Sequence, residues 1–79
     1  MSEIEFKATL QMLIPMVIQT IIEKRNVSVI KAIELLYKSK LYKKLEVEKT
    51  KLWHLSPLAL YELLDNEITT GNLIFPTEA

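Results

Sequence analysis

The stretch "MLIPMVIQTII", residues 12–22, decides what kind of fold this chain can adopt. Nine of its eleven residues are apolar, and only Gln19 and Thr20 interrupt them. A helix that is apolar nearly all round needs burial on most of its sides. The stretch is also shorter than the roughly 20 apolar residues that a membrane span requires. We therefore expect the central helix of a small soluble domain and no contact with a membrane.

Pro15 leaves the start of this helix open. The apolar spacing is helical and extends back to about residue 5. Proline lacks the N–H that would bond the carbonyl of Gln11, and its ring crowds that turn. Either the helix bends at Pro15, or it begins near Met12 and residues 1–11 form an extended arm. We favour the start near Met12. The residues that show the helical spacing are Phe6, Leu10, Leu13, Val17, Ile18 and Ile21.

The middle of the chain also has helical patterns and no strand-like alternation. A second helix is expected from Ser28, a residue type that caps free backbone amides, to about Lys40. A short third helix at 41–46 and a loop at 47–51 follow. The expected core face of the second helix consists of Val29, Ile33, Leu36 and Tyr37.

The Ser-Pro dipeptide at 56–57 predicts the start of the last helix. Serine is a favourable N-cap, and proline at the first helical position has no N–H to lose. The helix is expected over 57–69 and should end at Gly71, the only glycine. Beyond it, Leu73 and Phe75 are candidates to dock on the bundle. The expected core face consists of Leu60, Leu64 and Ile68, flanked by Tyr61 and Leu63.

Length and composition allow one domain. A chain of 79 residues buries only about 60% of its unfolded surface, and without cysteine it has no disulfide support. We expect an all-α domain over 1–79, a compact bundle of three to four short helices. Its core spans about 12–70, between the arm at 1–11 and a tail at 71–79. The absence of cysteine and of a basic leader fits a cytoplasmic protein.

His54 and Ser56 are the candidates for a catalytic site. A histidine that titrates near neutral pH can act as a base or a metal ligand. A serine nucleophile would need it together with an orienting acid such as Glu62 or Asp65. Zinc needs three or four ligands, and the chain has one histidine and no cysteine. We interpret Ser56 as a helix cap and expect no catalytic residue, metal or cofactor.

Trp53 is interpreted as a lid on the core, because tryptophan buries a large apolar surface. Together with Leu52 and Leu55 it is expected to plug the gap between the second helix and the last.

Charge is unevenly distributed, although the chain holds 10 basic and 10 acidic residues. Residues 37–51 carry a net charge of +4 and residues 62–79 a net charge of −4. A lysine patch can bind nucleic acid phosphates or an acidic protein. We favour a solvated face balanced by the acidic segment of the same chain. The lysines are Lys38, Lys40, Lys43, Lys44, Lys49 and Lys51, and the acidic residues of 62–79 are Glu62, Asp65, Glu67 and Glu78.

The apolar excess of 12–22 is the strongest functional signal. Three other short helices offer little cover for it, and methionine suits an adaptable contact surface. Either the helix is fully enclosed, or a second apolar face binds a copy of the chain or another protein. The candidate partner-binding residues are Met12, Met16, Val17, Ile21 and Ile22.

Residues 35–67 contain the pattern LYxSKxYxxL followed by TxLWxxSPxxLYxLxxxE. In this pattern the chain resembles short, uncharacterised bacterial helical proteins of the domain-of-unknown-function kind. The resemblance implies a small accessory protein of Gram-positive bacteria, encoded in some cases beside toxin-like enzymes of the ADP-ribosyltransferase type, and no catalytic role. The matching residues are Leu36, Tyr37, Ser39, Lys40, Tyr42, Leu45, Thr50, Leu52, Trp53, Ser56, Pro57, Leu60, Tyr61, Leu63 and Glu67.

These observations favour a non-enzymatic protein–protein interaction or regulatory module, an antitoxin-like partner that is a homodimer or binds another protein. The alternative is a small nucleic-acid-binding protein that uses the lysines of 38–51. An enzyme built on His54 would need a cleft, which nothing in the spacing predicts.

Overall fold

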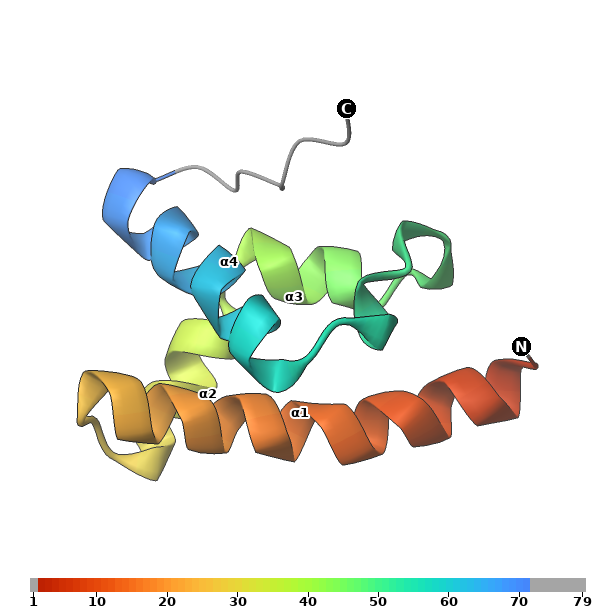
Figure 1. Ribbon diagram of the computed structural model, residues 1–79, viewed down its shortest axis with the longest axis horizontal. Coiled ribbons are helices and arrows are strands. Elements are labelled where there is room, and N and C mark those ends of the chain that lie inside the picture. The colour runs from red at the N-terminus through yellow and green to blue at the C-terminus, as the bar shows by residue number, and fades with distance from the viewer. Residues whose placement is uncertain (1, 72–79) are drawn as a thin grey trace.

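The computed structural model describes residues 2–71, which fold into a bundle of four α-helices (Figure 1). The helices are α1 (Glu3–Arg25), α2 (Val29–Tyr37), α3 (Lys40–Leu45) and α4 (Pro57–Thr70), and the 3₁₀ helices η1 (Glu48–Thr50) and η2 (Leu52–His54) connect α3 to α4. No strand occurs in this part of the chain, so the all-α prediction is confirmed. Helix α1 runs along one edge; α3 and α4 lie above it, and α2 passes behind its C-terminal half (Figure 1).

Helix α1 begins at Glu3 and not near Met12, so the expected extended arm is wrong. The Ser2 hydroxyl accepts a hydrogen bond from the backbone N–H of Glu5 at 3.1 Å. The Glu5 carboxylate in turn accepts one from the backbone N–H of Ser2 at 2.9 Å. This reciprocal capping box satisfies two amides that a helix start otherwise leaves free, so the helix is stable from its first turn.

Pro15 lies inside α1 without ending it. The proline is exposed, so the missing hydrogen bond to the carbonyl of Gln11 falls on the solvent side of the helix, where water can replace it. The last turn closes at Asn26, which adopts the left-handed conformation and donates its backbone N–H to Ile22 at 2.9 Å. One unbroken helix of 23 residues therefore forms the base of the bundle.

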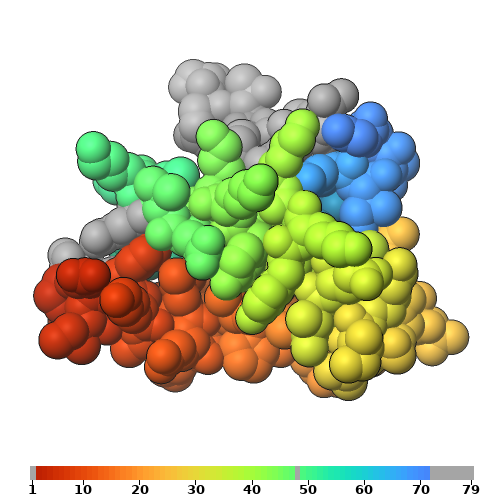
Figure 2. Space-filling model, turned by 180° about the vertical axis from the view of Figure 1, so that it is seen from behind, coloured from red at the N-terminus to blue at the C-terminus, as the bar shows by residue number. Residues whose placement is uncertain are grey.

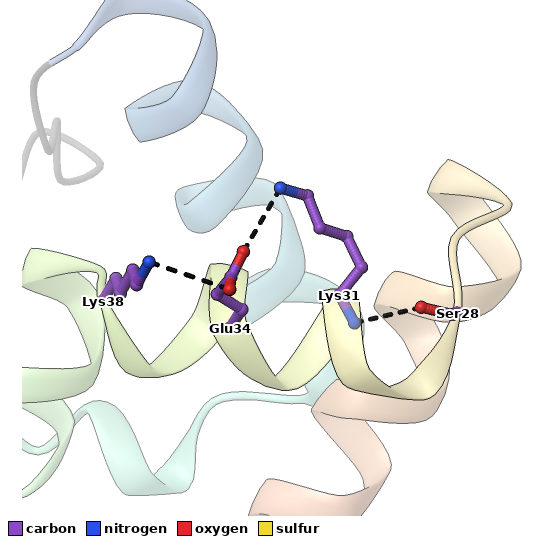
Figure 3. Close-up of polar contacts among 4 residues, drawn as sticks. All are labelled: Ser28, Lys31, Glu34 and Lys38. Atoms are coloured by element: carbon purple, nitrogen blue, oxygen red, sulfur yellow. Dashed lines mark hydrogen bonds and ion pairs between the residues drawn. The ribbon is translucent and has the colours of Figure 1, made fainter.

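The predicted caps of the later helices are confirmed. Ser28 accepts a hydrogen bond from the backbone N–H of Lys31 (Figure 3), and Ser56 accepts one from Ala59, each at 3.1 Å. Gly71 ends α4 in the left-handed region, with φ of 81°. Helix α2 ends at Tyr37, slightly before the predicted Lys40, because the chain turns at Lys38 and Ser39 to begin α3.

The core lies where α1 faces the three other helices. Its fully buried side chains are Val17, Ile21, Ala32, Leu36, Leu41, Leu45, Leu60 and Leu64. Two expectations about buried faces are wrong: Val29 and Tyr37 of α2 are exposed, and on α4 Leu63 is buried whereas Ile68 is exposed. Helical periodicity shows which residues share a face, but the neighbouring helices decide which face is buried.

Helix η2 covers the N-terminal half of α1. Leu52 is buried, and the Trp53 ring lies edge-on against the ring of Phe6, with centroids 6.4 Å apart. The lid was predicted for the gap between α2 and α4, whereas the structure places it against α1, and η2 also contacts α3. Leu73 and Phe75 of the expected tail lie outside the described residues. No helix within residues 2–71 has the length and apolar character needed to cross a membrane.

Candidate interaction surfaces

The side of α1 that faces away from the bundle carries a line of apolar side chains, which we call the outer stripe: Ile4, Ala8, Met12 and Met16. Their four-residue spacing places them one above the other along the helix, over a length of about 18 Å. Ile4, Met12 and Met16 are 81%, 73% and 52% exposed, and Ala8 is exposed as well. These exposures mean that no other helix within residues 2–71 covers the stripe.

The structure separates the five predicted partner-binding residues. Only Met12 and Met16 lie on the outer stripe, whereas Val17 and Ile21 are fully buried and Ile22 is half-buried against the core. Val17 and Ile21 follow Met12 by five and nine positions. They therefore lie about 140° and 180° around the helix from Met12, and their side chains point inward. The most exposed member, Ile4, was missed because it fell within the expected arm, and the capping box at Ser2 was the signal that could have revealed it.

The lysines of α3 form a second surface. Lys40, Lys43 and Lys44 are exposed, whereas Leu41 and Leu45 of the same helix are buried. None of the three forms an ion pair with an acidic side chain that the structure describes. In Figure 2, the α2–α3 segment lies above α1 and long side chains project from it. We call Lys40, Lys43 and Lys44 the lysine face.

Lys49 and Lys51 are also exposed, on the connection between α3 and α4. Lys38, in contrast, pairs with Glu34 at 3.7 Å, and the same carboxylate holds Lys31 at 3.4 Å (Figure 3).

The acidic residues of α4 form other contacts. Asp65 pairs with Arg25 at 2.5 Å and so ties the end of α1 to α4. The Glu67 carboxylate accepts hydrogen bonds from the backbone N–H groups of Lys40 at 2.7 Å and Leu41 at 3.1 Å, and so caps α3. Within residues 2–71, no lysine of the 38–51 patch therefore pairs with a side chain of α4. Of the expected balance by the acidic segment, the described residues show the Glu67 carboxylate at the N-terminus of α3 and no ion pair; Glu78 lies outside them.

A shallow groove with a volume of about 380 Å³ lies between α1 and the α2–α3 junction. Tyr37 and Tyr42 stack in it, with ring centroids 4.5 Å apart and planes 15° from parallel. Burial raises the pKa of Tyr42 from 10.0 to about 12, and the negative charge of Glu46 and the Tyr37 phenol add to this effect. Tyr42 is thus a neutral aromatic surface at physiological pH. The other residues of the groove are Lys7, Leu10, Gln11, Ile14 and Pro15.

A second hollow of about 390 Å³ lies between α2 and the end of α4. Both carboxylates of this hollow already have partners, because Glu34 forms ion pairs with two lysines and Glu67 caps α3. Its lining residues therefore serve the fold. They are Lys31, Glu34, Leu35, Lys38, Ser39, Glu67, Ile68 and Gly71.

His54 and Ser56 lie away from both hollows. The exposed His54 ring rests edge-on against Trp53, with centroids 5.7 Å apart. The Ser56 hydroxyl caps α4, as predicted from the Ser-Pro dipeptide. No group of three His, Asp or Glu side chains with the arrangement of a metal site occurs in the described part of the chain.

In comparisons with protein-family models, with curated proteins and with solved structures, no match to the chain was found. The resemblance to short bacterial helical proteins therefore stays a prediction. Several residues of its pattern have clear roles in this fold: Ser39 and Glu67 cap α3, Ser56 caps α4, and Leu60 belongs to the core. The pattern thus describes contacts that build the bundle.

Proposed function

We propose that the chain is a non-enzymatic interaction module that forms a homodimer through the outer stripe of α1. The exposure of Ile4, Met12 and Met16 along one line carries this proposal. Apolar surface removed from water contributes about 25 cal/mol per Å², so a continuous stripe favours association, whereas isolated exposed apolar residues do not. The neighbouring Met12 and Met16 side chains are flexible, which suits a contact that must fill irregular gaps.

The regular spacing of the stripe favours a second copy as the partner. A two-fold symmetric interface uses the same surface on both subunits. In an antiparallel pair of α1 helices, Ile4 would face Met16 of the partner subunit, and the small Ala8 would face Met12 of the partner subunit. Large side chains opposite small ones allow two helices to approach closely. A stripe about 18 Å long gives a small interface, so we expect a weak, reversible dimer.

Sedimentation equilibrium over a series of protein concentrations tests the dimer. We expect the wild-type mass to rise toward twice the monomer mass, and Met12→Lys to remain monomeric because a charge would be buried without a partner. Ile30→Lys is the matched control: Ile30 is 74% exposed, close to the 73% of Met12, but it lies on α2. A wild-type chain that stays monomeric at millimolar concentration, or equal effects of the two variants, would contradict the proposal.

We further propose that this dimer acts as a regulatory accessory protein of the antitoxin-like kind in the bacterial cytoplasm. The absence of cysteine supports a reducing compartment, and the LYxSKxYxxL pattern supports the class of protein. The test is the activity of an enzyme encoded beside this chain, measured with and without the purified chain. Unchanged enzyme activity with a saturating excess of the chain would refute the regulatory role. The dimer is tested separately by sedimentation equilibrium.

A further inference from the structure

The proposed dimer makes no use of the lysine face or of the groove that holds Tyr37 and Tyr42. Three positive charges on one side of a six-residue helix have no described acidic partner. A further lysine, Lys7, lines the groove that holds the stacked tyrosines. Like charges left this close together repel one another, so an anion that neutralises them gains affinity from all three.

The tyrosine pair gives the groove a flat aromatic surface. Tyr42 covers one face of the Tyr37 ring, and Tyr37 is still 48% exposed. The stack holds the ring in place, so little conformational freedom is lost when a further planar group packs on it. Leu10 and Ile14 of α1 form an apolar floor beside it.

We propose that this surface binds single-stranded nucleic acid, with phosphates on Lys40, Lys43 and Lys44 and a base stacked in the groove on Tyr37. A positive surface beside exposed aromatic rings is the common arrangement in proteins that bind single strands without sequence preference. A planar base accounts for the aromatic stack, which an acidic peptide would not need. The surface has no arginine for bidentate base contacts, and α3 is too short to read a duplex groove.

Fluorescence anisotropy with a labelled 15-nucleotide oligothymidine at 50 and 200 mM NaCl tests the proposal. With three phosphate contacts, affinity should fall roughly 20-fold between these salt concentrations. Lys43→Gln/Lys44→Gln should weaken binding and lower the slope of log affinity against log salt by about 1.4. The double variant Lys24→Gln/Lys31→Gln has the same net charge but alters lysines of α1 and α2, so its binding should stay within about twofold of wild type.

Tyr37 variants test the stacking. Tyr37→Ala should weaken binding about tenfold, whereas Tyr37→Phe keeps the ring and should bind like wild type. Circular dichroism confirms that each variant is folded. The Met12→Lys variant should bind the oligonucleotide normally, which separates this inference from the proposed dimer.

The inference would be overturned by no binding at 50 mM NaCl, by full affinity in Tyr37→Ala, by equal loss in the two lysine double variants, or by equal competition by poly-L-glutamate. The last result would identify a surface for acidic proteins. Tighter binding of the duplex than of the single strand would also contradict the stacked base.

Discussion

The ring of Phe6 lies edge-on against the indole of Trp53, with centroids 6.4 Å apart and planes at 78°. This contact joins the first turns of α1 to η2, which is 47 residues further along the chain. Phe6 is buried although the residues on both sides of it are exposed. The N-terminal third of α1 is therefore anchored by one aromatic side chain on its inner side, and its outer side remains available for a partner.

Replacement of Phe6 by alanine tests this anchor. Phe6→Ala should lower the free energy of unfolding by about 2–4 kcal/mol, because a nearly buried ring leaves a cavity beside Trp53. Ile4→Ala lies half a turn away but is exposed, so its effect should stay within about 0.5 kcal/mol. Urea unfolding followed by Trp53 fluorescence measures both. Equal, small effects would mean that residues 3–11 do not pack on the bundle.

The Glu67 carboxylate is expected to stabilise α3 from a distance. It accepts two backbone hydrogen bonds at the N-terminus of α3, where the helix dipole also favours a negative charge. Glu67→Gln should lower the free energy of unfolding by about 1 kcal/mol. Amide hydrogen exchange should become faster at Lys40 and Leu41. Glu62→Gln, an exposed position on the same helix, is the control and should leave both observables unchanged.

The helix caps of this fold are the contacts that can be predicted from the sequence. Ser28, Ser56 and Gly71 were correctly predicted, because a serine cap bonds an amide three residues away and a glycine C-cap depends on its own backbone angles. Ser2 with Glu5 is an equally local signal, but Pro15 was given more weight. A proline on the solvent side of a long helix loses one hydrogen bond to the protein and does not stop the helix.

The contacts that form the candidate surfaces depend on distant neighbours. Glu67 is 27 residues from Lys40, so no local spacing predicts that its carboxylate caps α3. Because the carboxylate bonds backbone amides, it forms no ion pair with the side chains of the lysine face. The division of α1 into the buried Val17 and the exposed Met12 depends on where α2, α3 and α4 pack. The sequence of a helix that is apolar nearly all round does not show which of its faces will be buried.

Substitution of Pro15 by alanine should stabilise the protein. Alanine restores the hydrogen bond from residue 15 to the carbonyl of Gln11 and has a higher helix propensity, and the gain is partly offset by a more flexible unfolded chain. We expect the free energy of unfolding to rise by about 1–2 kcal/mol. Thermal unfolding by circular dichroism measures the change. Gln11→Ala, which alters an exposed side chain but not its carbonyl, should change stability much less, and a loss of stability in Pro15→Ala would contradict this account.

The raised pKa of Tyr42 should make the folded protein less stable at high pH. The folded protein raises its pKa from 10.0 to about 12, mainly through burial. Between these values the unfolded chain releases a proton that the folded chain keeps, so the free energy of unfolding falls as the pH rises through this window. Tyr42→Phe has no such proton, and every contribution that the two proteins share cancels in the difference. Urea unfolding of both proteins at pH 8, 9 and 11 should give the same difference at the two lower values. At pH 11 the wild type should lose stability relative to the variant, and a difference that stays constant up to pH 11 would show that Tyr42 is not buried against α1 and Glu46.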